Sequence, residues 1–280
     1  NVNRIDQNAF LATDSSVLES YTVSTGNNYF SSEDGVLFNK DKTVLLYYPN
    51  CRVSQDTAYI IPDTVTEIGR DAFAYQSRIT QLGTELSSEY KMSLNSNGTT
   101  ITTRVILPEG LTKIGHDAFG HCINLTSINL PKSLAIIDDE AFASVSATSV
   151  VIPASVSKIY ADIFNGSKIT SAYFLGNAPE MGATIGLNPF PSNCQIYYTT
   201  GTTGWSSTIG SYTDSSGTNS SYNCSAGGVF SGTLSTNTNI TWTVDTYART
   251  LTLSGAGSMN FQSKDDSPFY KYRDLVSKVV

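Results

Sequence analysis

The chain concentrates its potentially reactive side chains in one short segment, residues 115–122, which reads GHDAFGHC. His116, Asp117, His121 and Cys122 are residue types that bind zinc, and a closed zinc site needs four such ligands in tetrahedral geometry. The two histidines are the only ones in the sequence, and no further ligand set of suitable spacing accompanies them. We therefore predict no metal site and place both histidines at variable positions of a surface turn.

Other candidate chemistry is also weak. Acidic residues are adjacent at Asp138-Asp139-Glu140, Glu33-Asp34 and Asp265-Asp266. Glycosidases need two carboxylates that face each other across a cleft, whereas adjacent acids on turns are usually solvated. No Gly-x-Ser-x-Gly nucleophile motif occurs. The sequence thus predicts no catalytic residue, no cofactor and no enzyme.

Composition excludes further classes of function. Hydrophobic residues make up 40% of the chain, enough to bury a core, and the net charge of −7 would repel a phosphate backbone. No apolar run approaches the roughly 18 residues of a membrane-spanning helix. We expect no nucleic-acid binding and no membrane insertion. The four cysteines form no CxxC pair, and their spacing allows either free thiols or a Cys194–Cys224 bridge.

Internal repetition organises the first two thirds of the chain. Four prolines each precede a phenylalanine by eleven positions: Pro62 and Phe73, Pro108 and Phe119, Pro131 and Phe142, Pro153 and Phe164. Apolar residues recur three and six positions after each proline. The prolines are separated by 46, 23 and 22 residues, so one unit is about 23 residues long. Val2, Ile5 and Phe10 fit the same frame, which predicts that the chain begins inside a repeat and that the parent protein is longer.

Each unit has the pattern of a strand, a turn and a short helical or 3-10 turn. Residues 125–130 alternate with the period of a half-buried strand, and Pro131 would end it. The Ala-Phe pair would close the layer from the opposite wall. Since one unit cannot bury its apolar side alone, neighbouring units must stack into a solenoid.

Two insertions interrupt the repeats. Residues 24–57 hold an apolar run at 35–38, a polar turn and a second apolar run at 43–49, which predicts a β-hairpin. Residues 84–103 lie where one repeat is missing, and the turn signal at 95–98 favours a second hairpin or a degenerate repeat.

The segment LTKIGHDAFGHCINLTSINLPKSLAIIDDEAF at 111–142 resembles the bacterial surface-antigen (BspA-like) class of leucine-rich repeat. Gln76, Val145 and Ser167 depart from it, because they replace the cysteine of the repeat. The resemblance implies an α/β leucine-rich-repeat solenoid with β-hairpin insertions. It also implies a bacterial protein that is extracellular or exposed on the cell surface.

The chain divides into three predicted parts. Residues 1–198 form the repeat domain. Residues 199–228 are expected to be a linker, because 23 of these 30 residues are Gly, Ser, Thr or Asn. Residues 229–280 form a β-rich segment with a hairpin at 239–254 and a short helix from Ser267. This segment is similar to the lead-in that precedes a further repeat array in family members with several arrays.

The strands offer a candidate binding surface. Residues two positions before each proline should face the open, concave side of the solenoid, together with a second column two positions earlier. The predicted stripe comprises Ile60, Ile106, Asn129, Val151, Phe174, Arg104, Ser127 and Ser149. Such an apolar stripe is either a docking groove or is covered by the insertions or the C-terminal segment.

We therefore expect a non-catalytic recognition or adhesion protein. The expected partner is a protein on a host or neighbouring cell, bound through the solenoid face. The alternative is a carbohydrate-binding accessory module of a larger secreted protein, for which Trp205 and the tyrosines would supply aromatic surface. A third possibility is a structural spacer.

Overall fold

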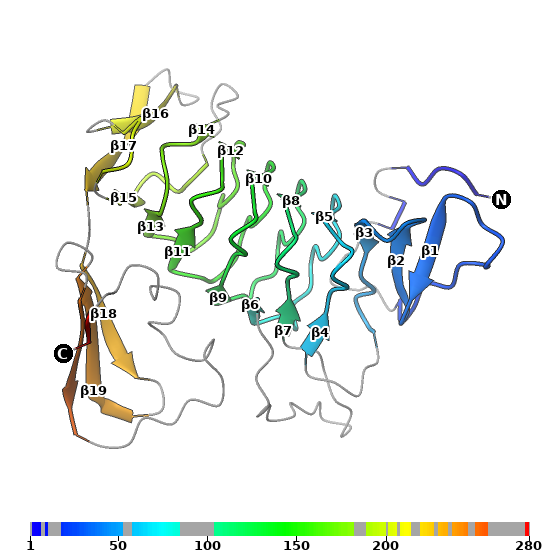
Figure 1. The fold of residues 1–280 in the computed structure, drawn as a ribbon, viewed down its shortest axis with the longest axis horizontal. Coiled ribbons are helices and arrows are strands. Elements are labelled where there is room, and N and C mark those ends of the chain that lie inside the picture. The colour runs from blue at the N-terminus through cyan, green and yellow to red at the C-terminus, as the bar shows by residue number, and fades with distance from the viewer. Residues whose placement is uncertain are drawn as a thin grey trace.

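The computed structural model describes residues 2–6, 9–10, 18–52, 58–84, 104–181, 189–199, 201–205, 208–213, 219–226, 229–234, 237–245, 250–256 and 278–279. Within these ranges the chain forms twenty-one strands and no helix (Figure 1). None of the described segments is therefore a helix long and apolar enough to cross a bilayer.

The repeats stack as the sequence predicts, and each coil places one strand on each of two faces. One of these faces lies on the side away from the predicted stripe, and we call it the opposite face. Its strands belong to an eight-stranded sheet in the order β1-β2-β3-β5-β8-β10-β12-β14. The bounds are β1 Phe30–Glu33, β2 Val36–Asn39, β3 Val44–Tyr47, β5 Glu67–Ile68, β8 Lys113–Ile114, β10 Ile136–Ile137, β12 Lys158–Ile159 and β14 Glu180–Met181. The strands from β3 to β14 are parallel.

The other side, which we call the stripe face, carries the predicted stripe. It consists of two sheets with the orders β4-β7-β6-β9 and β11-β13-β15-β17-β16. The bounds are β4 Ala58–Ile60, β6 Gln81–Gly83, β7 Arg104–Ile106, β9 Ser127–Ile128, β11 Ser149–Ile152, β13 Ser171–Phe174, β15 Gln195–Tyr198, β16 Thr208–Thr213 and β17 Asn219–Ala226.

The predicted helical or 3-10 turns are wrong. The turn around each phenylalanine contains two left-handed residues four positions apart, one on each side of the ring residue, such as Asp71 and Tyr75, or Asp117 and His121. A left-handed residue cannot continue a right-handed helix, so the segment forms successive turns instead. The amides of these turns reach the next coil; Phe119, for example, donates to the carbonyl of Ala141 at 2.9 Å. A third backbone ladder thus joins the coils along this turn edge.

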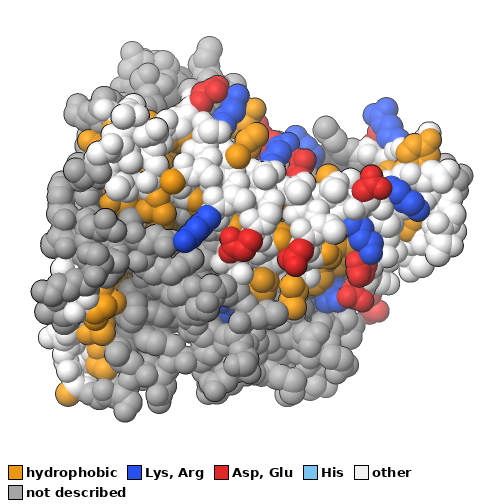
Figure 2. Space-filling view, in the orientation of Figure 1, with side chains coloured by type: hydrophobic (Ala, Val, Ile, Leu, Met, Phe, Trp, Pro, Cys, Tyr) orange, Lys and Arg blue, Asp and Glu red, His pale blue; other side chains and the backbone are white. Residues whose placement is uncertain are grey.

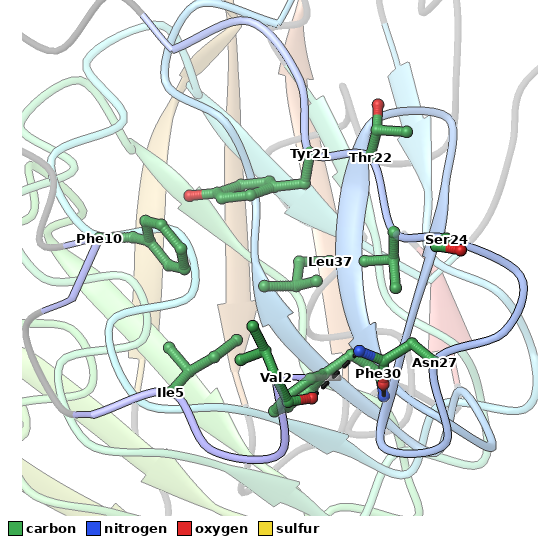
Figure 3. Close-up of a pocket in the computed structure, with 10 residues that line it drawn as sticks. Val2, Ile5, Phe10, Tyr21, Thr22, Ser24, Asn27, Phe30 and Leu37 are labelled. Carbon is green, nitrogen blue, oxygen red and sulfur yellow. Dashed lines mark hydrogen bonds between the residues drawn. The ribbon is translucent and has the colours of Figure 1, made fainter.

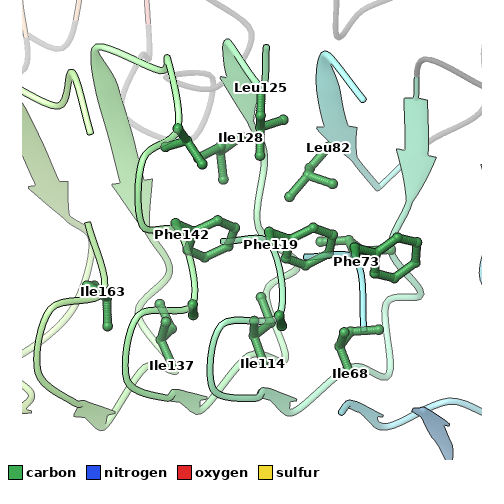
Figure 4. Packing of buried hydrophobic residues seen from close by; sticks show 14 of the residues in the cluster. Ile68, Phe73, Leu82, Ile114, Phe119, Leu125, Ile128, Ile137, Phe142 and Ile163 are labelled. Carbon is green, nitrogen blue, oxygen red and sulfur yellow. The ribbon is translucent and has the colours of Figure 1, made fainter. Parts of the chain in front are cut away.

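The core is a continuous column of aromatic rings between the two faces (Figure 4). Stacked phenylalanine rings succeed one another with centroids 5.0–5.5 Å apart: Phe73, Phe119, Phe142, Phe164 and Phe190. Isoleucines from the opposite face and leucines or isoleucines from the stripe face close each layer. The repeat frame read from the sequence is therefore the frame of the core.

One feature of the stripe face departs from the repeat. β7 lies between β4 and β6 although it follows both in the chain, and β6 pairs with β7 in parallel. This face thus carries one strand more than the repeat requires, and the strands that flank the insertion, β6 and β7, run parallel to each other. Residues 85–103, including the predicted turn at 95–98, lie outside the described part.

The predicted hairpin insertion at 24–57 is confirmed, since β1, β2 and β3 pair antiparallel. Near the C-terminus β18 (Val229–Leu234), β19 (Asn237–Asp245), β20 (Thr250–Gly255) and β21 (Lys278–Val279) form a separate sheet, which contains the predicted 239–254 hairpin. β16 and β17 occupy much of the predicted 199–228 linker. The helix predicted from Ser267 lies outside the described residues.

Candidate recognition surface

The predicted stripe is largely buried. Ile60 is 50% exposed, whereas Ile106, Asn129 and Val151 are buried. In the second column Arg104 is only 2% exposed. Ser127 and Ser149 are half-buried. Parallel pairing aligns Ile60 with Ile106. Ile106 next lies beside Gly83, and Val151 lies beside Tyr173, so the predicted residues do not form one open groove.

The stripe residue assigned to β13 is wrong by one position. Val151 pairs with Tyr173, and Ile152 pairs with Phe174. Phe174 consequently lies in the core, where it contacts the rings of Phe190 and Trp205. The frame is lost here because this repeat has Leu175 where the others have proline, and the Leu175 amide donates to the carbonyl of Ile152 at 3.0 Å.

The C-terminal end of the stripe is covered by the chain itself. Val151 and Tyr173 belong to a second apolar cluster together with Ile240, Trp242 and Val244 of β19. These side chains bury one another away from the main core. At β11 and β13 the C-terminal segment therefore covers the apolar stripe, which is one of the two arrangements that the sequence left open.

The opposite face carries a different row, which the prediction missed. Adjacent strands align five residues that project from this sheet, namely Glu67, Lys113, Ile136, Lys158 and Glu180. We call them the charged row. Figure 2 shows that acidic and basic side chains are interspersed along this side of the array. The sequence contained the signal, because the first four of these residues each lie five positions after a repeat proline.

Ion pairs hold the lysines of the charged row in place. Lys113 Nζ lies 3.1 Å from Glu67 and 3.5 Å from Asp138, and Lys158 Nζ lies 3.2 Å from Glu180. Burial alone would lower the pKa of Lys113, but the hydrogen bond and charge of Glu67, aided by Asp138, raise it overall. Both amines therefore stay charged at neutral pH.

Beside the charged row, the turn edge stacks acidic residues from successive coils. Asp71, Asp117 and Glu140 all occupy the first left-handed position of their turns. Burial, followed by the charges of Asp71 and Glu140, raises the pKa of Asp117 to about 7, although His116 and Arg70 oppose this. Oδ1 of Asp117 and Oδ2 of Asp71 are buried without a hydrogen-bond partner. This column can hold a proton near neutral pH.

A small apolar cavity lies at the N-terminal end of the array (Figure 3). Its volume is about 310 Å³, and its lining includes Val2, Ile5, Phe10 and Tyr21. Phe10 packs edge-on against Tyr21 and Tyr47, and the carbonyl of Val2 accepts a bond from Asn27 Nδ2 at 3.0 Å. The first repeat residues thus line a cavity instead of a closed core layer.

The remaining chemical candidates are the His-Asp-Cys segment and the other cysteines. Among the described residues, no three His, Cys, Asp or Glu side chains gather in a way that could hold a metal ion. The thiol of Cys122 is fully buried and that of Cys194 is nearly so, and burial raises the pKa of both to about 12. Cys122 and Cys194 are free thiols, so Cys194 does not bridge to Cys224.

The sequence pattern described as BspA type Leucine rich repeat region matches the chain in six copies, over residues 48–170 and 93–213. Together these spans cover more than half of the chain. The chain belongs to the BspA-type leucine-rich-repeat family. Membership confirms the family resemblance that the sequence suggested.

Several proteins of known structure are similar to this chain. The pneumococcal vaccine antigen PcpA is 22% identical with a TM-score of 0.41, over 65% of this chain and 45% of PcpA. A leucine-rich cell surface protein from Faecalibacterium prausnitzii A2-165 is 22% identical with a TM-score of 0.39, over 52% of this chain and 34% of that protein. A leucine-rich repeat protein from Bacteroides capillosus ATCC 29799 is 24% identical with a TM-score of 0.39, over 53% of this chain and 100% of its own length.

The chain thus spans less than half the length of the first two of these structures. No curated protein sequence matches it.

Proposed function

We propose that this BspA-type chain is a non-catalytic recognition protein, secreted or exposed at a bacterial cell surface. It binds a macromolecular partner, such as a host matrix protein or a protein of a neighbouring cell, through the charged row of the opposite face. The observation that carries the proposal is the alignment of Glu67, Lys113, Ile136, Lys158 and Glu180 on five adjacent parallel strands.

Two properties of the row suit a protein partner. First, strands about 4.8 Å apart present side chains over an extended surface, which matches a macromolecule better than a small ligand. Second, Lys113 and Lys158 are already positioned by their ion pairs, and Lys158 Nζ lies 4.7 Å from the centroid of the Tyr160 ring. Side chains that are ordered before binding lose less conformational entropy when a partner docks.

The family assignment supports the location, because the resemblance is to a class of bacterial surface antigens. The alternative of a carbohydrate module gains little support from Trp205. Its ring stacks on Tyr198 at 4.9 Å, and its indole N–H donates to the carbonyl of Gly176 at 3.1 Å. This tryptophan is used for packing rather than for an open sugar platform.

A binding screen tests the proposal. The purified chain is applied in parallel to a panel of matrix and cell-surface proteins and to a glycan array. We expect a protein ligand whose affinity falls about tenfold or more in the double variant Lys113→Glu/Lys158→Glu, and falls with rising salt. Lys168→Glu is the control. It reverses the charge of one exposed lysine away from the row, which is half the charge change of the double variant.

The screen can also overturn the proposal. Equal binding of the double variant and the parent chain would exclude the charged row as the site. Glycan binding with a blank protein panel would replace the proposal with the carbohydrate module. Hydrolysis of any glycan by the purified chain would refute the non-enzyme assignment.

A further inference from the structure

The stripe face carries an apolar row at its C-terminal end. Parallel pairing aligns Val151 of β11 with Tyr173 of β13, and Tyr173 with Tyr197 of β15. The neighbours of these residues along each strand, including Ala172 and Ile196, face the main core. Because side chains alternate along a strand, the row lies on the outer side of the sheet.

One side of the C-terminal hairpin packs on this row. Ile240, Trp242 and Val244 alternate along β19, and their cross-strand neighbours Leu251 and Leu253 lie opposite Val244 and Trp242 on β20. These residues share one apolar cluster with the row. The contact is therefore that of two sheets packed face to face, with apolar side chains between them.

This contact is built separately from the solenoid core. The described residues of the C-terminal sheet contribute nothing to the main apolar cluster, which ends at Ile196 and the partly buried Tyr198 and Trp205. The sheet also has its own ladder from β18 to β21, which does not continue into either solenoid face. It can consequently leave the row without breaking a strand pair of the array or opening a core layer.

We propose that the C-terminal sheet is a reversible cover, which undocks from Val151, Tyr173 and Tyr197 as a unit while the solenoid stays folded. Undocking exposes a second recognition surface on the stripe face. The partner that fits it has the chemistry of the present occupant, a β-sheet whose alternate residues are large and apolar. Partner binding to the uncovered row rests on the proposed function, whereas undocking of the C-terminal sheet does not.

The two tryptophans report on the two bodies separately. Trp242 lies in the cover, and Trp205 packs against the main core. The full chain is labelled with 5-fluorotryptophan, and both fluorine resonances are followed by NMR during a urea titration. We expect the Trp242 resonance to reach its solvent-exposed position at a lower urea concentration than that of Trp205.

Val151→Ser removes apolar surface from the row without touching the core. It should lower the Trp242 midpoint by about 0.5–1 M urea and leave the Trp205 midpoint in place. Ser149→Ala, a change at a half-buried residue of the same strand that lies outside the cluster, should move neither resonance.

The proposal is overturned if both resonances change together at one midpoint in the parent and in Val151→Ser. It is also overturned if Val151→Ser shifts both midpoints equally, since the cover would then be an integral part of the solenoid. The NMR titration contains no partner. A blank binding screen would therefore count against the proposed function without affecting the outcome of the titration.

Discussion

The repeat array and the C-terminal sheet bury apolar side chains in different ways. In the array each core position is repeated from coil to coil, so an inner ring such as Phe119 or Phe142 contacts the ring before it and the ring after it. The C-terminal sheet contacts the array through one row of side chains. Repetition spreads the stability of a solenoid over all its interfaces, whereas a single contact can be lost without the rest. The following variants test this difference.

The largest effect should come from changing the register of the array. Deleting residues 84–106 removes 23 residues and joins Gly83 to Leu107. The Leu107 amide already donates to the Gly83 carbonyl at 2.8 Å, and the joined sequence matches residues 125–131 position by position. We expect a folded array with a cooperative unfolding transition, with β6 now beside β4.

The control deletes 84–105, one residue fewer. The side chain that follows Gly83 would then be Ile106, and every later residue would be displaced by one position relative to β6. A slip of one residue exchanges the core and solvent sides of a strand, so this variant should lose its cooperative transition in circular dichroism. Equal stability of the two deletions would contradict a fixed repeat frame.

Phe119→Ala should have the next largest effect. The ring is fully buried, 5.0 Å from Phe73 and 5.5 Å from Phe142. Its loss should reduce the free energy of unfolding by about 3–5 kcal/mol, measured by urea denaturation. Phe10→Ala is the matched control at a ring that is 40% exposed, where we expect about 1 kcal/mol or less. A similar loss in both would mean that the aromatic column is not the main support of the array.

Asp117→Asn should change how stability depends on pH. The pKa of Asp117 is raised to about 7 in the folded chain, against about 3.9 in an unfolded one. The folded state therefore holds this proton more tightly, and the parent loses stability as the pH rises from about 4 through 7. Asparagine stays neutral and tolerates the left-handed backbone that Asp117 adopts, with φ of 51°.

At pH 8 we expect Asp117→Asn to be more stable than the parent by on the order of 1–2 kcal/mol, allowing for solvent screening. The difference should vanish near pH 4, as measured by thermal unfolding across this range. Asp63→Asn, at an exposed turn residue, serves as the control. A stability gain that is the same at both pH values would show that the charge of Asp117 is not its cause.

The smallest effect should follow from Lys113→Met. It removes the ion pairs with Glu67 and Asp138, which lie near solvent and are worth about 0–1 kcal/mol. The loss in urea denaturation should shrink further at high salt. A loss above about 2 kcal/mol would mean that the charged row supports the array as well as presenting a surface.

The sequence predicted the coils because the proline-to-phenylalanine frame is also the frame of core packing. It failed where local features replaced that frame. Acidic residues such as Asp71 and Asp117 give no sign that they adopt left-handed backbone, so the sequence predicts helical segments where the chain forms turns. Leu175 hides the register of β13, so the sequence places Phe174 at the surface in place of Tyr173.

Two further features depend on long-range placement. The position of β7 between β4 and β6 reverses the order of these strands in the chain, which no local pattern records. The cover over Val151 requires two segments about ninety residues apart to meet, and alternation in β19 shows only that one of its sides is apolar. By contrast, the charged row could have been read from the position five residues after each proline.

The three ladders that join the coils also determine how the molecule bears mechanical load. Hydrogen bonds between the coils of Phe73 and Phe119 run along the array on the opposite face, the stripe face and the turn edge. A pull along the axis is therefore shared by all three sides of an interface, and the array resists stretching as a stiff rod. The C-terminal sheet is held across the axis by side chains. If the cover undocks as proposed, the same pull would separate it before any coil opens, and Tyr173 and Tyr197 would be exposed.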